Sequence, residues 1–373
     1  MPAATSSSKL PAHREHALAR LDRYLEAALR AHAFPGAVVA FGHADEAPTV
    51  RCYGHLAYEA SAPVTPGTRY DLLCMTKPMS IGAVLARAVA EDGFDLDARV
   101  AHDLPELARA GKGGLTWRHL LTHSGGLAPS HSYDRLPGRT REEVIAQVLA
   151  TPPRFEPGTK YEYSCDGFIL MGLALERRTG MRLDELVTRQ VFEPLGMRSA
   201  AYGPASAPLE GDIAPTHPYR VARTGVIRGT TCEPLAAALG GIAASSGIFA
   251  SADDVARFAR AWLGHAPRGT TPLFDPRVTA RFQRVQDPQR LGTTGLAWDT
   301  RSPAGYTVAG RAFGPRSFGH TGASGCSMWL DPESRTYVVL LSNAVYDADG
   351  QRRYVWVRPR VSELVAAALR ADA

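Results

Sequence analysis

Several classes of protein are excluded by what this sequence lacks. Its 373 residues hold five cysteines, an odd number without the paired spacing of a metal site, so we expect reduced thiols rather than a disulfide framework. The cysteines are Cys52, Cys74, Cys165, Cys232 and Cys326. The Ser/Ala-rich residues 1–11 lack the apolar core of a signal peptide, and no apolar run looks long enough to span a bilayer. We therefore expect a cytoplasmic protein that does not enter a membrane.

The composition is that of a folded globular protein. Hydrophobic residues make up 45% and charged residues 21% of the chain, so disorder is not expected. The net charge is +5, but lysine and arginine are scattered and form no dense run, which does not support a nucleic-acid surface. The length suits two cores, or one core with a large insertion.

Strand patterns lie near both ends of the chain and helical patterns fill its middle. Strands are predicted over residues 37–41, 50–53, 327–330 and 336–341, the first two as a hairpin. Helices are predicted over residues 13–33, 81–93, 116–122, 141–150, 168–179, 183–192, 253–263 and 361–369. There are no internal repeats. This order predicts one sheet built from the two chain ends and interrupted by an inserted helical domain, with an active-site cleft between the two parts.

A thiol and an amine stand three residues apart at the start of one predicted helix. Cys74 and Lys77 share a helix face, so the ammonium group can lie beside the sulfur. First-turn amides and the helix dipole add positive potential there, which lowers a thiol pKa from about 8.5 and favours the nucleophilic thiolate. The stretch by itself leaves an alternative open, in which Cys74 is a small buried apolar residue and Lys77 a solvated surface charge.

Five short segments resemble, in order, the motifs of one enzyme family. Cys74-Met75-Thr76-Lys77 resembles the Ser-x-x-Lys element of serine β-lactamases and penicillin-binding proteins, with cysteine in the serine position. Residues 120–127 are similar to the loop that follows in the class C branch and its esterase relatives. Tyr163-Ser164-Cys165 resembles the Tyr-x-Asn element. Residues 192–197, and then 319–322 before a strand, complete the order.

The resemblance runs from about Gly36 to Asn343 and implies the fold of that family. This is an α/β (α+β) fold in which an antiparallel sheet is flanked by helices and carries an inserted all-helical domain. Residues 1–70 and 300–373 are expected to form the α/β domain, and residues 71–299 the inserted domain.

The resemblance also implies a role for each matched residue. Cys74 corresponds to the nucleophile, Lys77 to the lysine that assists proton transfer, and Tyr163 to the residue that carries a proton to the leaving group. The backbone amides of Cys74 and Ala323 correspond to the oxyanion hole. His320 stands where β-lactamases usually carry lysine, which weakens the case for recognising a substrate carboxylate.

Two other patterns look superficially like binding sites. His119 and His123 are four residues apart, but the glutamate of a His-Glu-x-x-His zinc site is absent. Gly240 and Gly241 have no phosphate-loop lysine after them, so they predict a place where the backbone packs closely against its neighbours rather than a nucleotide site. We therefore expect neither a metal nor a cofactor.

Both departures from the family pattern are to cysteine. Cys165 replaces an asparagine that usually hydrogen-bonds a substrate amide, and a thiol is a poor substitute, so the sequence does not favour β-lactam or peptide substrates. Cys74 would form a thioester, which favours amine acceptors over water. We therefore predict an acyltransferase that moves an acyl group from a small ester or thioester donor to an amine or alcohol, with Tyr163 as the base, in small-molecule or natural-product biosynthesis.

Two alternatives remain open at this point. The same site suits a cytosolic esterase or amidase, because hydrolysis of the acyl intermediate is not forbidden. The chain could instead be a catalytically silent binding protein, or a serine-to-cysteine form that traps the intermediate. A further prediction is that oxidation joins Cys74 to Cys165, provided that their Cα atoms lie within about 7 Å.

Overall fold

The computed structural model describes residues 12–59, 61–129, 138–203, 212–217, 225–267, 269–303, 305–346 and 353–370. The Ser/Ala-rich residues 1–11 lie outside this part of the chain.

Strands from both ends of the chain form one antiparallel sheet. The sheet has six strands in the order β2-β1-β9-β8-β7-β6. Their bounds are Gly36–His43 (β1), Thr49–Gly54 (β2), Asp299–Thr300 (β6), Phe318–Thr321 (β7), Ser327–Asp331 (β8) and Thr336–Ser342 (β9). β1 pairs with β2, which confirms the predicted hairpin, and also with β9, from the other end of the chain.

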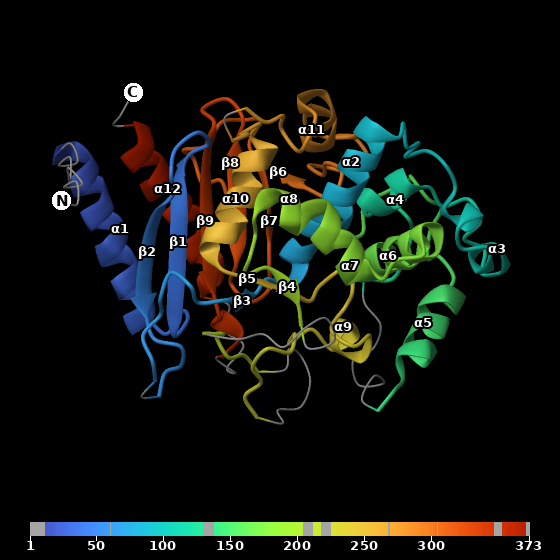
Figure 1. Ribbon diagram of the computed structural model, residues 1–373, viewed down its shortest axis with the longest axis horizontal. Helices are drawn as coiled ribbons and strands as arrows, with labels where there is room; N and C mark the ends of the chain where they lie inside the picture. The colour runs from blue at the N-terminus through green and yellow to red at the C-terminus, as the bar shows by residue number, and fades with distance from the viewer. Residues whose placement is uncertain are drawn as a thin grey trace.

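Helices cover both faces of this sheet. On one face, α1 (Ala12–Arg30) lies beside α12 (Tyr354–Arg370), and on the other α10 (Ala252–Trp262) packs against β1, β8 and β9 (Figure 1). Alternate residues of β1 therefore enter two separate cores. Val38 and Ala40 join the core under α10, while Val39 and Phe41 join the core under α1 and α12.

The segment between β2 and β6 supplies most of the other helices. These are α2 (Ala83–Glu91), α3 (Glu106–Arg109), α4 (Trp117–Leu121), α5 (Arg141–Ala150), α6 (Cys165–Thr179), α7 (Leu183–Val187), α8 (Glu193–Leu195), α9 (Pro234–Ala238) and α11 (Pro276–Gln283). A small second sheet, in the order β3-β5-β4, also lies here, where the sequence predicts helices alone. Its strands are Tyr70–Asp71 (β3), Ala201–Tyr202 (β4) and Ile248–Ala250 (β5). The division at residues 71 and 299 stays a prediction, and α10 packs on the main sheet although it falls inside the inserted range.

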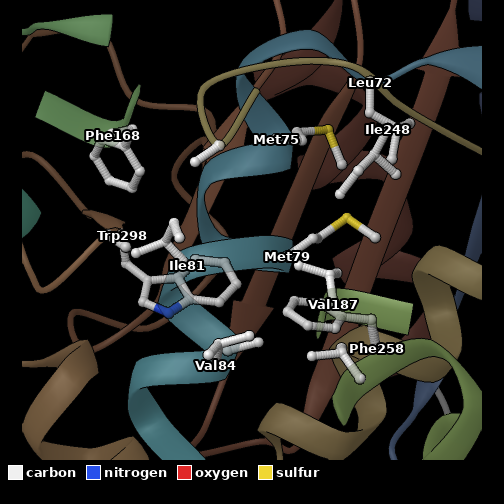
Figure 2. Packing of buried hydrophobic residues seen from close by; sticks show 14 of the residues in the cluster. Leu72, Met75, Met79, Ile81, Val84, Phe168, Val187, Ile248, Phe258 and Trp298 are labelled. Carbon is white, nitrogen blue, oxygen red and sulfur yellow. The ribbon is translucent and has the colours of Figure 1, made fainter. Parts of the chain in front are cut away.

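A central helical stretch carries the chain from the site into the core. A 3-10 turn at Leu73–Met75 leads through a π-helical segment at Pro78–Gly82 into α2. Figure 2 shows Met75 and Met79 in a buried cluster with neighbours from other elements. Leu73–Glu91 is the one stretch among the described residues that is long and apolar enough to cross a membrane, contrary to the expectation above. However, 72% of its apolar window is buried inside the protein, as in a core helix of a globular fold.

The last helix begins earlier than the sequence predicts. α12 begins at Tyr354 rather than near residue 361, and Pro359 lies inside it. Proline removes one helical hydrogen bond, but Val357 and Val361 on either side are buried against the sheet, and their burial offsets that loss. This extension matters because it brings the first turn of α12 to the site.

Candidate active site

A strained turn presents Cys74 at the end of β3. Leu73, directly before Cys74, has a left-handed backbone with φ of +47°, which is unfavourable for a residue with a branched side chain. The buried carboxylate of Asp71 accepts hydrogen bonds from the Leu73 amide at 3.1 Å and the Cys232 amide at 2.8 Å. Burial raises the pKa of Asp71 to about 6. These contacts fix the turn so that Cys74, which is partly exposed, faces the cleft.

Lys77 lies directly beneath Cys74 and is fully buried. Its Nζ is 3.5 Å from the sulfur of Cys165 and 3.2 Å from the carbonyl oxygen of Ser245, and it also hydrogen-bonds to Cys74. Burial by itself lowers the pKa of Lys77, but its electrostatic and hydrogen-bond interactions with Cys165 and Cys74 outweigh burial and raise the pKa above its usual value. The alternative of a solvated Lys77 is therefore wrong.

The start of α6 brings Tyr163 and Cys165 to the same place. Cys165 is the first residue of this helix, and Tyr163 comes just before its N-cap. Nζ of Lys77 lies 4.8 Å from the centre of the Tyr163 ring. The sulfur of Cys165 hydrogen-bonds to Cys74, and so does the hydroxyl of Tyr163. Tyr163 and Cys165, which stand at the tyrosine and asparagine positions of the Tyr-x-Asn element, thus both contact Cys74.

These contacts favour loss of the proton from Cys74 rather than from Cys165. The hydrogen bond from Cys165, the charge of Lys77 and the hydrogen bond from Tyr163 together outweigh burial and hold the pKa of Cys74 well below its usual value. Donating that hydrogen bond, together with burial, raises the pKa of Cys165 well above its usual value. Burial and the nearby Cys74 charge likewise raise the pKa of Tyr163. These shifts favour the thiolate form of Cys74 over that of Cys165, and the protonated form of Tyr163.

His123, four residues after His119, holds Tyr163 in place. Its ring lies 4.2 Å from the Tyr163 ring, centre to centre, and its Nδ1 accepts a hydrogen bond from the Ser164 amide at 3.1 Å. Burial lowers the pKa of His123 well below its usual value, so the ring is neutral, as an acceptor must be. His119 instead accepts from the amide of Thr116 at the start of α4. The sequence predicts no metal site at His119 and His123, and it carries no signal that the His123 ring packs on Tyr163.

The end of β7 forms the opposite wall. Nδ1 of His320 lies 2.9 Å from the carbonyl oxygen of Thr321, and because a carbonyl only accepts, this nitrogen carries a proton. A side chain at Gly322 would clash with the carbonyl oxygen of Leu72, so glycine permits the loop to pack against the nucleophile turn. Ala323 follows and lines the cleft.

The cleft between these walls has a volume of about 330 Å³. The residues that line it include Cys74, Tyr161, Tyr163, Asp299, His320 and Ala323. Lys77 and Cys165 do not line the cleft, but both contact Cys74, which does. The structure therefore brings together all six predicted site residues, and adds Tyr161 and Asp299, which no motif indicates.

Arg358, from the extended first part of α12, holds the loop after β7. It is buried, and its guanidinium donates to the carbonyl oxygens of Gly322, Gly325 at 3.3 Å and Cys326 at 2.9 Å. Three hydrogen bonds from one planar cation fix the backbone that carries the Ala323 amide. The sequence carries no signal for this role, because the loop and the arginine are more than thirty residues apart.

Comparison with known proteins identifies the family of this chain. The sequence model of the Beta-lactamase family matches residues 21–359. A provisionally named D-alanyl-D-alanine carboxypeptidase of Escherichia coli (strain K12) is 28% identical over 329 residues, which cover 80% of this chain and 75% of that protein.

Two solved structures show the same fold. EstCE1, described as a hydrolase with promiscuous acyltransferase activity, superposes with a TM-score of 0.74 at 21% identity, covering 95% of this chain and 99% of that chain. D-alanine carboxypeptidase AmpC from Burkholderia cenocepacia gives a TM-score of 0.71 at 20% identity, with the same coverage. Because the family match spans most of the chain, this protein belongs to the Beta-lactamase family, as an enzyme of the β-lactamase fold that is a hydrolase or an acyltransferase.

Proposed function

We propose that this protein is an acyltransferase that carries the acyl group on Cys74 as a thioester. The observation that carries this proposal is the set of hydrogen bonds and the buried cation around the Cys74 sulfur, which lines the cleft. Cys165, Lys77 and Tyr163 all contact the Cys74 sulfur, and the pKa of Cys74 is held well below its usual value. A preformed thiolate attacks a carbonyl carbon without first losing a proton to a base.

In the first half-reaction, the Cys74 sulfur attacks the acyl carbon of an ester or thioester donor. The carbonyl oxygen gains negative charge and is stabilised by the backbone amides of Cys74 and Ala323. As the tetrahedral intermediate collapses, the bond to the leaving group breaks and Tyr163 donates the proton that the leaving group needs. The raised pKa of Tyr163 keeps this proton available at neutral pH.

In the second half-reaction, the acceptor attacks the thioester. The Tyr163 phenolate left by the first step is strongly basic, so it takes the proton of the incoming amine or alcohol. The carbon–sulfur bond then breaks and regenerates the Cys74 thiolate, which the Lys77 ammonium stabilises. Amines attack thioesters far more readily than water does, which favours transfer to an amine over hydrolysis. EstCE1, which shares the fold, is described as having acyltransferase activity beside hydrolysis.

Hydrolysis is the second candidate. The similar Escherichia coli protein is named as a carboxypeptidase, and such an enzyme must hold the terminal carboxylate of its substrate. In this cleft, the Arg358 guanidinium is occupied by backbone carbonyls, and Asp299 adds a negative charge. An esterase acting on uncharged or cationic esters therefore fits better than a carboxypeptidase.

The two candidates differ in their products. The protein is incubated with activated acyl esters, with and without a series of amines, while amide and free acid are measured. We expect amide to form at the expense of free acid as amine is added, and intact mass to show an acyl adduct on Cys74 that is missing in Cys74→Ala. Free acid released at one rate whatever the amine would identify a hydrolase. Turnover without any adduct on Cys74 would overturn the thioester mechanism.

A further inference from the structure

We propose that the cleft selects a substrate that carries a cation, such as a quaternary or protonated amine, through the carboxylate of Asp299 and the rings of Tyr161 and Tyr163. This inference rests on the proposed function, because it specifies the donor or acceptor of the same site. The cation is a group additional to the reacting carbonyl or amine.

Asp299 reaches the cleft from the edge of the main sheet. It lies on β6, directly opposite Gly319 of β7 and next to the strand position of His320. Glycine has no side chain, so the cross-strand neighbour cannot cover or neutralise the carboxylate. The half-buried Asp299 side chain therefore lines the same cleft as Cys74.

Among the described residues, the carboxylate of Asp299 has no partner of its own. Within the described ranges no hydrogen bond or ion pair is found for it, although the chain holds 42 lysines and arginines. Other carboxylates do find such partners, for example Asp97 with Arg118 and Glu106 with Arg177. A half-buried carboxylate in a cleft loses part of its hydration, and a ligand cation restores the balance of charge.

Two aromatic rings stand beside this charge. Burial, and after it the charge of Asp299, raises the pKa of Tyr161, and the same charge contributes to the raised pKa of Tyr163. Tyr161 is 39% exposed and lies with its ring 5.8 Å from the His123 ring, on which Tyr163 also packs. Tyrosine faces attract cations, particularly quaternary ammonium groups that cannot hydrogen-bond strongly to water.

The cations near the cleft are already committed to protein groups. Arg358 donates to three carbonyl oxygens and also hydrogen-bonds to the Tyr306 hydroxyl. Lys77 is buried beneath Cys74 and is held by two sulfurs and a carbonyl oxygen. Neither is placed to hold a substrate anion, whereas Asp299 is placed to hold a cation.

The test compares esters of equal shape and different charge. The donor arm uses the p-nitrophenyl ester of trimethylammoniobutyrate against its neutral carbon isostere, the ester of dimethylhexanoate. The acceptor arm uses trimethylammoniopropylamine against its neutral isostere, dimethylpentylamine, with one neutral donor. We expect kcat/KM to be about tenfold or more higher for the cationic member in at least one arm, which also tells whether donor or acceptor carries the charge.

Substitutions assign the preference to Asp299. Asp299→Asn is expected to bring the cationic-to-neutral ratio close to one, and Asp299→Lys to invert it. Asp92→Asn removes an exposed carboxylate at the far end of α2 and should keep the wild-type ratio. A ratio near one in both arms for the wild type, or an unchanged ratio in Asp299→Asn, overturns the proposal. The neutral ester separates the two proposals, because an adduct on Cys74 without charge preference refutes only this inference, whereas no adduct refutes the thioester mechanism.

Discussion

The side-chain nitrogen of Lys77 lies 3.5 Å from the sulfur of Cys165, 88 residues further along the chain. Lys77 also contacts Cys74, so one buried ammonium serves two sulfurs. A single cation stabilises a single thiolate, and the second sulfur keeps its proton and donates a hydrogen bond to the first. In the mechanism that we propose, Cys165 therefore takes part in the activation of Cys74.

Removing the hydrogen bond from Cys165 should raise the pKa of Cys74. In the wild type the thiolate is present above this lowered pKa and is lost as the pH falls through it. In Cys165→Ala the midpoint should move to higher pH, so that alkylation by iodoacetamide is about tenfold slower at acidic pH, since a hydrogen bond to a charged group contributes about 1.5 to 3 kcal/mol. Cys165→Ser keeps a donor and should shift the midpoint less. Identical profiles for wild type and Cys165→Ala would contradict this role.

Mild oxidation should inactivate the enzyme reversibly. Hydrogen peroxide takes two electrons from the Cys74 and Cys165 sulfurs, forming one disulfide and two waters. We expect nearly complete loss of esterase or transferase activity, a mass loss of about two daltons, and recovery with dithiothreitol. Cys165→Ser has no second thiol and should not show the reversible loss. Retention of full activity by the oxidised wild type would refute a disulfide at this site.

Tyr163→Phe should slow acylation more for esters with a basic leaving group than for esters with an acidic one. Alkyl esters leave as poor, basic alkoxides and need the proton of Tyr163, so acylation should fall by about 10² to 10³. p-Nitrophenolate leaves without protonation, so its ester should be affected much less. Stopped-flow measurement of the acylation burst with both esters tests this. Equal losses for the two esters would mean that Tyr163 acts on the nucleophile or the fold instead.

Gly322→Ala should separate the loop after β7 from the nucleophile turn. The added methyl group would clash with the carbonyl oxygen of Leu72, so the Ala323 amide moves away from the developing oxyanion. Loss of one oxyanion donor corresponds to about 10²-fold or more in kcat. Gly67→Ala meets only the Thr65 hydroxyl oxygen, at 3.8 Å, and is the matched control. Wild-type kcat in Gly322→Ala would show that this close approach is unimportant.

Met79→Ala should destabilise the protein without touching the cleft. The side chain is fully buried in the central helical stretch (Figure 2), so truncation leaves a cavity that costs about 2 to 5 kcal/mol of the free energy of unfolding. The control is Met181→Ala, which truncates a partly exposed side chain after α6. It should lower the free energy of unfolding by less than about 1 kcal/mol. Urea unfolding of both variants measures the difference. Equal stabilities would show that the core around Met79 collapses to fill the space.

Much of the architecture follows from the sequence. The long strands β1 and β9 and the helices α5 and α6 carry clear periodic or apolar patterns, because each must bury a face against its neighbours. The sequence does not predict the short strands of the second sheet, because two or three residues are too few to show an alternating pattern. The sequence also does not predict the first half of α12, because Pro359 argues against a helix there. Burial in the folded protein stabilises this part of the helix despite the lost hydrogen bond.

The sequence by itself determined which residues to examine for the proposed site, namely Cys74, Lys77, Tyr163 and the His-Thr-Gly wall, because these residues occur in short local motifs. Only the tertiary structure decided the direction of the pKa shifts in the site, since these shifts depend on burial and on contacts across dozens of residues. It also placed His123, Arg358 and Asp299, whose types carry no local signal. The contact between Lys77 and Cys165 also depends on the tertiary structure, because folding alone brings these two residues together.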